Sequence, residues 1–396
     1  MSAKNLFKPL QIGSLSLKNR IGMSALTRNR AEGTYPTELM KEYYVQRAVG
    51  GAGLIISEGI LICRQGSPWP NAPGLWDENH VAGWRIITDA VHNAGGKIYA
   101  QVRSRLGHCS ARSNPSFDFQ LWHTGRLSHP DAPEQKLAGE PVYAPSAIAA
   151  RGGKFRQLPG EPGFVTPTAI DDPRVLIGKY THAAINAKKA GFDGVELMAS
   201  SGVLPHQFLD YNSNQRTDEW GGSIENRARF GLELLKALKD VYGPDVGVKL
   251  SPAAGLNDLG MPLQDTLNTF SYFISEADKL NLSYIALVRY NPVWDAALNG
   301  TLRGTDHDVL EAYRPYIRNS KVFINTGVTP EEGEELISAG KIDGVFIGLN
   351  WATHPDLAKR VEQGIALNNP PNVPLLQAPA SQDDYVSGYT DYPTAV

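Results

Sequence analysis

Residues 191–230, GFDGVELMASSGVLPHQFLDYNSNQRTDEWGGSIENRARF, carry the strongest indication of the fold. They begin with a short apolar strand at 194–198, pass through a long polar loop that contains Gly221 and Gly222, and enter a helix near Ser223. A strand that ends in a polar, glycine-bearing loop ahead of a helix is typical of the active-site rim of a (β/α)8 barrel. Spacing alone leaves open an ordinary βα connection in another α/β protein.

Seven further stretches repeat this strand-and-helix order. Each predicted strand is dense in Val, Ile or Leu rather than alternating, as expected for strands that are buried on both faces. Eight such units favour a closed barrel, so we predict one (β/α)8 TIM barrel domain over residues 1–396; an open, doubly wound sheet is the alternative. The predicted strands cover residues 20–24, 53–59, 97–101, 194–198, 246–251, 283–289, 321–327 and 344–349, and the predicted helices cover 37–49, 79–94, 172–190, 223–241, 264–280, 306–316, 330–339 and 355–366.

The helix predicted at 330–339 has the clearest boundaries. Thr329 suits the N-cap, Pro330 the first helical position, and Glu332 completes a capping box. Gly340 follows the helix, where a left-handed residue commonly ends it.

The composition restricts which kinds of partner and which cellular location we expect for this protein. The chain has 396 residues, of which 42% are hydrophobic and 20% charged, with a net charge of −3. That charge gives no reason to expect nucleic acid or an anionic membrane as partner, and no apolar run approaches a membrane span. Two cysteines, Cys63 and Cys109, are too few for a disulfide framework or a metal cluster. We therefore expect a cytoplasmic protein without a metal, whose partner is a small molecule.

The string NQRTDEWGGSIENRARF at residues 214–230 is long and specific. It resembles the signature of the old yellow enzyme family, the FMN-dependent ene-reductases that use NAD(P)H. The likeness extends from NLFKPLQIG at residues 5–13 to GYTDYP at 388–393. It implies a barrel that holds FMN and reduces the C=C bond of an α,β-unsaturated carbonyl.

One long excursion follows the third predicted strand and interrupts the likeness. In the family, a YAQ-type strand end leads directly into LWHxGR; here residues 102–120, VRSRLGHCSARSNPSFDFQ, lie between them. The segment is rich in Ser and Arg and has no helix or strand period, so we expect a disordered insertion. Its first and last residues have codons compatible with in-frame intron boundaries, which leaves a retained intron or a genuine surface loop. Residues 368–396, rich in Pro, Ala and Asp, are predicted as a C-terminal arm.

The resemblance implies a set of residues around the flavin ring. Those at strand ends are expected to border the isoalloxazine, and a glycine among them allows close approach of the ring. The resemblance also implies a side-chain amide that hydrogen-bonds to the pyrimidine edge of the flavin. Gln101 or Gln120 supplies this amide, depending on how the chain accommodates the insertion. The implied ring contacts are Ala25, Leu26, Thr27, Gly59, the Gln101 or Gln120 amide, and Lys249, which stands in for a family Arg.

The phosphate end departs from the family pattern. Gly327 and Gly348 are retained, but Thr326 replaces a second glycine and Leu349 stands where the family places its phosphate-binding Arg. Losing one charge-assisted hydrogen bond costs about 1.5–3 kcal/mol, so we expect weaker flavin binding.

The catalytic positions depart further. The family pattern HxxN/HxY supplies two donors to the substrate oxygen and a Tyr proton donor, and the aligned residues here are Met198, Ser201 and Val203. Met and Val donate no hydrogen bond, and removing such a donor costs about 10²–10³ in rate. His123 and Tyr290 are possible substitute proton donors, although a structural role is the alternative for each. Trp122 and Tyr290 complete the predicted substrate pocket.

Three functions therefore stay open. The first is an NAD(P)H-dependent FMN oxidoreductase with an altered donor set and a hydrophobic substrate from secondary metabolism. The second is a flavin-weakened or flavin-free isomerase or cyclase that works without net redox change. The third is a non-catalytic, degenerate homologue.

Overall fold

A computed structural model describes residues 5–66, 69–102, 123–151, 164–295, 297, 300–377, 381 and 383–396 of the chain. Most of the predicted insertion at 102–120 lies outside the described residues, as do Gln120 and Trp122. Val102 is described and forms the last residue of a strand. No helix in the described part is both long and apolar enough to cross a lipid bilayer.

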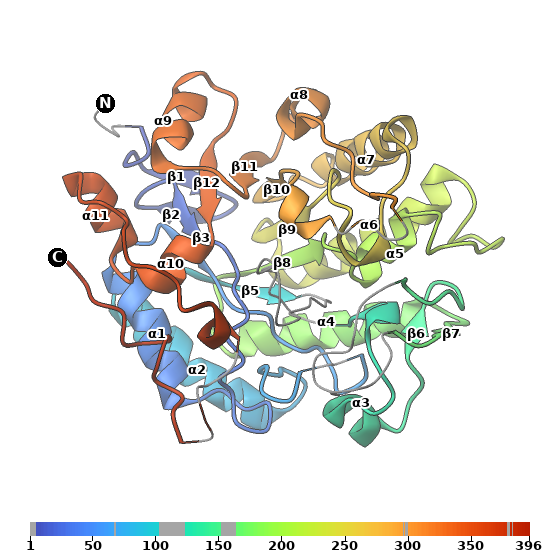
Figure 1. Cartoon of the computed structure of the whole chain (residues 1–396), viewed down its shortest axis with the longest axis horizontal. Coiled ribbons are helices and arrows are strands. Elements are labelled where there is room, and N and C mark those ends of the chain that lie inside the picture. The colour runs from blue at the N-terminus through green and yellow to red at the C-terminus, as the bar shows by residue number, and fades with distance from the viewer. Residues whose placement is uncertain are drawn as a thin grey trace.

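Eight parallel strands close into a barrel, which confirms the (β/α)8 prediction and excludes the open sheet (Figure 1). The strands are adjacent in the order β10-β11-β12-β3-β4-β5-β8-β9. Closure depends on the pairing of β12 with β3, in which Val345 lies opposite Ile21. The strands are β3 (Ile21–Met23), β4 (Leu54–Ile56), β5 (Ile98–Val102), β8 (Gly194–Ala199), β9 (Val246–Leu250), β10 (Tyr284–Val288), β11 (Lys321–Asn325) and β12 (Gly344–Ile347).

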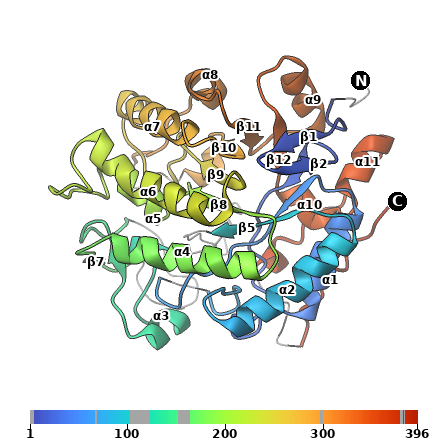
Figure 2. The same cartoon turned by 180° about the vertical axis from the view of Figure 1, so that it is seen from behind.

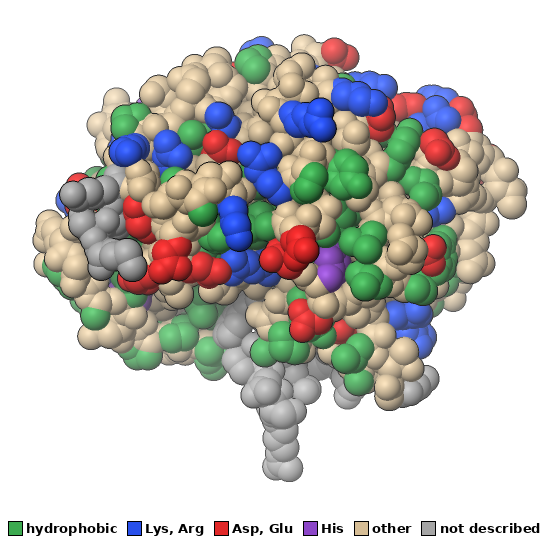
Figure 3. Space-filling view, turned by 90° about the horizontal axis from the view of Figure 1, so that it is seen from above, with side chains coloured by type: hydrophobic (Ala, Val, Ile, Leu, Met, Phe, Trp, Pro, Cys, Tyr) green, Lys and Arg blue, Asp and Glu red, His purple; other side chains and the backbone are tan. Residues whose placement is uncertain are grey.

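Helices surround the barrel, and the rear view shows α4 and α6 side by side (Figure 2). Lys, Arg, Asp and Glu are interspersed over the face seen from above rather than gathered into one large patch (Figure 3). The longer helices are α1 (Glu38–Val49), α2 (Glu78–Asn93), α4 (Arg174–Lys189), α6 (Ile224–Tyr242), α7 (Leu263–Asp278), α9 (Pro330–Ser338) and α11 (Leu357–Gln363). The shorter ones are α3 (Pro133–Ala138), α5 (Leu204–Leu209), α8 (Val309–Tyr313) and α10 (Leu349–Thr353).

Two helices differ from their predicted extents for local reasons. The helix predicted at 306–316 begins only at Val309, because Asp308 caps it by accepting hydrogen bonds from the N–H groups of Leu310 and Glu311. It then tightens into the 3-10 turn η4 (Arg314–Tyr316), where Pro315 has no N–H to continue an α-helix. The helix predicted at 355–366 ends earlier, at Gly364, whose φ of 68° stops the helix in the left-handed region.

A hairpin covers the amino end of the barrel and was missed by the sequence analysis. Strands β1 (Leu10–Ile12) and β2 (Leu15–Leu17) pair antiparallel around Gly13 and Ser14. The Ser14 N–H and hydroxyl donate to the carboxylate of Asp245, just before β9, at 2.8 and 2.6 Å. The alternating pattern on either side of a Gly-Ser turn is the signal that could have revealed it. A second small sheet pairs β6 (Tyr143–Ala144) with β7 (Thr168–Ala169).

Buried arginines attach the C-terminal arm to the barrel. Arg28 donates from Nε to the carbonyl of Leu376 at 2.8 Å and from Nη2 to the carbonyl of Gly388. The arm's Tyr389 stacks on Tyr43 of α1, with 4.3 Å between ring centroids. On the other side of Tyr43, the guanidinium of Arg47 lies 3.7 Å from the ring centroid.

Arg47 also attaches α1 to helix α10, which follows β12. Its Nη2 donates to the carbonyl of Ala352 at 3.0 Å and its Nε to that of Trp351 at 3.2 Å, and the side chain is fully buried. A shorter, uncharged side chain would leave these buried carbonyls without donors, at about 1–3 kcal/mol each.

We expect Arg47→Met to lower the free energy of unfolding by about 3 kcal/mol or more, measured by urea denaturation. The matched control is Arg174→Met, because Arg174 is about half exposed and pairs with an exposed Glu219. Its loss should be at most about 1 kcal/mol. Equal losses in the two variants would show that the buried guanidinium does not anchor α1 to α10.

Candidate active site at the carboxyl ends of the strands

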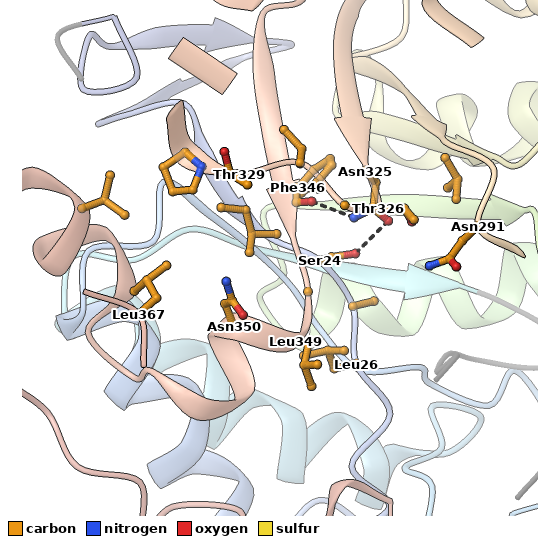
Figure 4. Close-up of a pocket in the computed structure, with 18 of the residues that line it drawn as sticks. Ser24, Leu26, Asn291, Asn325, Thr326, Thr329, Phe346, Leu349, Asn350 and Leu367 are labelled. Carbon is orange, nitrogen blue, oxygen red and sulfur yellow. Dashed lines mark hydrogen bonds between the residues drawn. The ribbon is translucent and has the colours of Figure 1, made fainter. Parts of the chain in front are cut away.

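A cavity of about 810 Å³ lies where β3, β9, β10, β11 and β12 end (Figure 4). Carboxyl ends of barrel strands are where active sites of this architecture are built. The predicted residues that line it are Ala25, Leu26, Ser201, Lys249, Gly327 and Gly348, together with Thr326 and Leu349. Ser24, Asn291, Asn325 and Asn350 also line it and were not among the predicted site residues. For Asn325, the available signal was its place near the end of the seventh predicted strand.

Other predicted residues lie elsewhere. Of those that the structure describes, Thr27, Gly59, Gln101, Met198, Val203, His123 and Tyr290 are not among the residues that line this cavity. Met198 and Val203 are fully buried, the first within β8 and the second just before α5.

A polar centre connects strands from opposite parts of the barrel. Lys249 on β9 is buried, and its Nζ donates to Ser24 Oγ at 2.8 Å. Ser24 Oγ in turn donates to Asn325 Oδ1 at 3.4 Å, while Asn325 Nδ2 donates to the carbonyl of Phe346 at 2.6 Å (Figure 4). This network places one cation and three neutral polar groups at the inner end of the cavity.

Several buried polar atoms near the strand ends have no hydrogen-bond partner among the described residues. They are Thr27 Oγ1 after β3, Gln101 Oε1 on β5 and Ser200 Oγ after β8. Gln101 Nε2, by contrast, donates to Glu196, which also accepts from the Tyr284 hydroxyl at 2.8 Å. Buried polar groups without partners are rare and call for an explanation. The carbonyl and N–H edge of an isoalloxazine offers both donors and acceptors, so Thr27 and Gln101 suit a flavin ring chemically, although neither is among the residues that line the cavity.

The part of the cavity assigned to the flavin phosphate fits less well. Leu349 opens α10 where the resemblance places an Arg, and Glu331 is the charged residue on this side of the cavity. Thr326 has a φ of 76°, in the left-handed region that favours glycine. The described residues therefore suit the ring of FMN better than its phosphate.

Neither proposed substitute donor faces this cavity. His123 is fully buried; its Nε2 is hydrogen-bonded to Gln65, and its Nδ1 accepts from the Gly125 N–H at 3.2 Å. Burial lowers the pKa of His123 to about 3, so the ring is neutral. Tyr290 lies on a separate cavity and donates to Asp295 at 3.0 Å. Burial, followed by that hydrogen bond, raises the pKa of Tyr290 to about 12.

The sequence pattern of the NADH:flavin oxidoreductase / NADH oxidase family matches residues 5–368. The chain belongs to this family. The resemblance to old yellow enzyme is thus confirmed, and the family implies FMN as cofactor.

Similar proteins extend over nearly the whole chain. "Probable inactive reductase easA" of Epichloe festucae var. lolii is 34% identical, over 99% of this chain and 96% of the relative. Chanoclavine-I aldehyde reductase fgaOx3 of Penicillium roqueforti is also 34% identical, over 98% and 95%. Morphinone reductase has a similar structure, with a TM-score of 0.83, 34% identity and coverage of 98% of this chain and 96% of that one. The old yellow enzyme homologue of Zymomonas mobilis has a TM-score of 0.82 and 30% identity, over 98% and 99%.

A buried carboxyl group supports the loop that carries Ala25 and Leu26. Glu58, after β4, accepts hydrogen bonds from the N–H groups of Arg28 at 3.1 Å and Asn29 at 3.2 Å. Burial raises the pKa of Glu58 to about 7, although these N–H groups and the charges of Arg28 and Arg30 act in the opposite direction. The Tyr44 hydroxyl donates to this carboxyl group at 3.4 Å, and Tyr389 interacts with it electrostatically.

This shift predicts a pH-dependent stability. An acid whose pKa is higher in the folded chain than its ordinary 4.5 holds its proton more tightly when folded. The free energy of unfolding therefore falls as the pH rises from about 4.5 to 7, by roughly 3 kcal/mol for Glu58 alone. We expect Glu58→Gln, which keeps an acceptor for the two N–H groups, to remove this loss.

The measurement is the difference in unfolding free energy between wild type and Glu58→Gln across that pH interval. The exposed Glu38→Gln provides the control and should follow the wild type at every pH. A wild-type–variant difference that is independent of pH would contradict the assignment.

Proposed function

We propose that this chain is a flavin-dependent NAD(P)H oxidoreductase that acts on the C=C bond of a hydrophobic α,β-unsaturated carbonyl compound in secondary metabolism. The observation that carries the proposal is the cavity at the carboxyl ends of the strands, with the Lys249–Ser24–Asn325 network at its inner end. A bound flavin would supply the transfer of hydride from NAD(P)H to the substrate. Relatives named as reductases support this activity, and the name of the Epichloe protein shows that a related chain is considered inactive.

The chain's own residues would bind and orient the carbonyl compound. Leu26, Val288 and Val293 give the cavity apolar walls that favour a hydrophobic substrate. Ser201 carries the one hydroxyl at the three aligned donor positions, and it lines the cavity. Its backbone is fixed on both sides: its N–H donates to Ser251 Oγ at 2.7 Å, and its carbonyl accepts from Asn257 Nδ2 at 2.7 Å. A hydroxyl held in this way can donate to the substrate oxygen without first being ordered.

A redox-neutral isomerase or cyclase on the same barrel is the second candidate. It is favoured by the phosphate end of the cavity, where Glu331 is the charged residue and no described lining residue is basic. Weak flavin binding would leave shape and hydrogen bonding to direct the reaction. The visible spectrum of the purified protein separates the two. We expect a yellow chromophore that NADPH bleaches; a colourless protein that still converts an unsaturated carbonyl compound would favour the second candidate.

Replacing Ser201 by glycine tests its role directly. Glycine accepts the φ of 55° found at Ser201, so the change removes the hydroxyl without adding backbone strain. We expect kcat/KM for an unsaturated carbonyl substrate to fall by about 100-fold, as for loss of an oxyanion donor.

The neighbouring Ser200→Ala is the matched control. Ser200 is buried, its hydroxyl has no partner among the described residues, and it is not among the residues that line the cavity. Its removal should leave kcat/KM unchanged. If both variants kept wild-type rates, Ser201 would not be the donor.

A further inference from the structure

The outer end of the cavity is built from aliphatic side chains. It extends from the loops after β11 and β12 to the groove between α9 and α11. Asn350, in the first turn of α10, lies between Leu367 and Leu349, and Leu349 lies beside Leu26 (Figure 4). The aliphatic residues that line this end are Val328, Pro330, Val361, Ile365 and Leu367, and Leu349 lines the cavity where this end meets Leu26.

The charged side chains around the cavity do not favour an anion at its outer end. Lys249 and Glu331 are the charged side chains among the described residues that line the cavity. Lys249 belongs to β9, separated from β12 by β10 and β11, and its ammonium donates to Ser24 at the inner end. Glu331 belongs to the first turn of α9, beside the loop that follows β11. The outer end therefore carries a negative charge rather than a positive one.

The nearby basic side chain is already engaged. Arg289, after β10, makes a two-pronged ion pair with Glu332, at 2.6 and 3.0 Å, and lines a different cavity. One N–H in the first turn of α9 is engaged as well, since the Thr329 hydroxyl accepts the N–H of Glu332 at 3.2 Å. Neither group is directed at the outer end of the site.

These groups distinguish a phosphate from an alcohol. A phosphate dianion has strong acceptors and is stabilised by cations, whereas a carboxylate repels it and cannot donate a hydrogen bond. An alcohol can donate to a carboxylate such as Glu331 and can both donate to and accept from an amide such as Asn350. The outer end is thus chemically matched to a neutral polyol tail.

We propose that the cavity binds the flavin through its ring and does not recognise the phosphate, so that riboflavin binds as tightly as FMN. The inference rests on the proposed function, because it concerns which flavin the same site accepts. It assigns discrimination between the two flavins to Leu349 and Glu331.

The experiment is a titration of the apoprotein with riboflavin and with FMN, followed by quenching of their shared flavin fluorescence. We expect the two dissociation constants to agree within about threefold, or riboflavin to bind more tightly. The reason is that no described side chain at the outer end offers the phosphate a charge-assisted hydrogen bond. FMN binding more than tenfold tighter than riboflavin would overturn the inference while leaving the proposed function intact. Binding of neither flavin would instead contradict the proposed function.

Variants at the outer end extend the test. Leu349→Arg should tighten FMN by about tenfold or more through one charge-assisted hydrogen bond and leave riboflavin unchanged. Glu331→Gln should tighten FMN by a smaller factor, and it checks the charge argument if the arginine variant does not fold. Leu349→Met, which adds no charge, is the matched control. Equal effects of Leu349→Arg on both flavins would also overturn the inference.

Discussion

Closure of the parallel barrel is the constraint on which the site depends. The last strand pairs with the first, and every strand then ends at the same mouth. Ser24, Lys249 and Asn325 are far apart along the chain, yet a network of hydrogen bonds connects them because each lies at or near a carboxyl end. A packed interior supports this arrangement, with Phe323, Phe346 and Tyr284 in mutual aromatic contact inside the barrel. The scaffold can therefore tolerate change at the mouth without losing its shape.

The departures from the family pattern that the sequence predicts fall at the mouth of the barrel rather than in its frame. Thr326 keeps the left-handed backbone of the loop after β11 although a β-branched residue pays for that conformation in strain. Such strain persists where the surrounding structure determines the backbone, and here β11 on one side and α9 on the other fix the loop. The loop after β11 thus keeps a left-handed backbone at Thr326, and the side chains beside it that line the cavity are neutral, apolar or acidic.

The sequence allowed the frame to be predicted because buried parallel strands leave a local signature. Runs of Val, Ile and Leu located all eight strands, and Thr329, Pro330 and Glu332 marked the start of α9 where the structure has it. Two of the strands end earlier than predicted for local backbone reasons that a run of apolar residues in the sequence does not reveal. The strands predicted to reach 327 and 349 end at Asn325 and Ile347, because Thr326 is left-handed and Gly348 begins a helix.

The site was less accessible to sequence reasoning, because side-chain direction depends on partners far along the chain. Gln101 was predicted to read the flavin, and its Nε2 donates into the barrel to Glu196, which lies 95 residues further on. Tyr290 was expected at the rim, but its hydroxyl is drawn to Asp295 and a different cavity. His123 was considered as a proton donor, and only the fold shows that Gln65 and the Gly125 N–H engage both ring nitrogens. For the predicted residues that do line the cavity, such as Ser201 and Lys249, the predicted roles in binding remain predictions.

The attachment of the C-terminal arm also bears on how the chain is made. Arg28 reaches its acceptors at Leu376 and Gly388 across 348 and 360 residues of sequence. On the ribosome, the acceptors of Arg28 are synthesised only after nearly the whole polypeptide. The guanidinium therefore cannot form its native hydrogen bonds until late in synthesis. Contacts of such long range slow folding, and chains that must wait for them expose apolar surface meanwhile. The arm that contains Leu376 and Gly388 therefore completes the burial of Arg28 only late in synthesis.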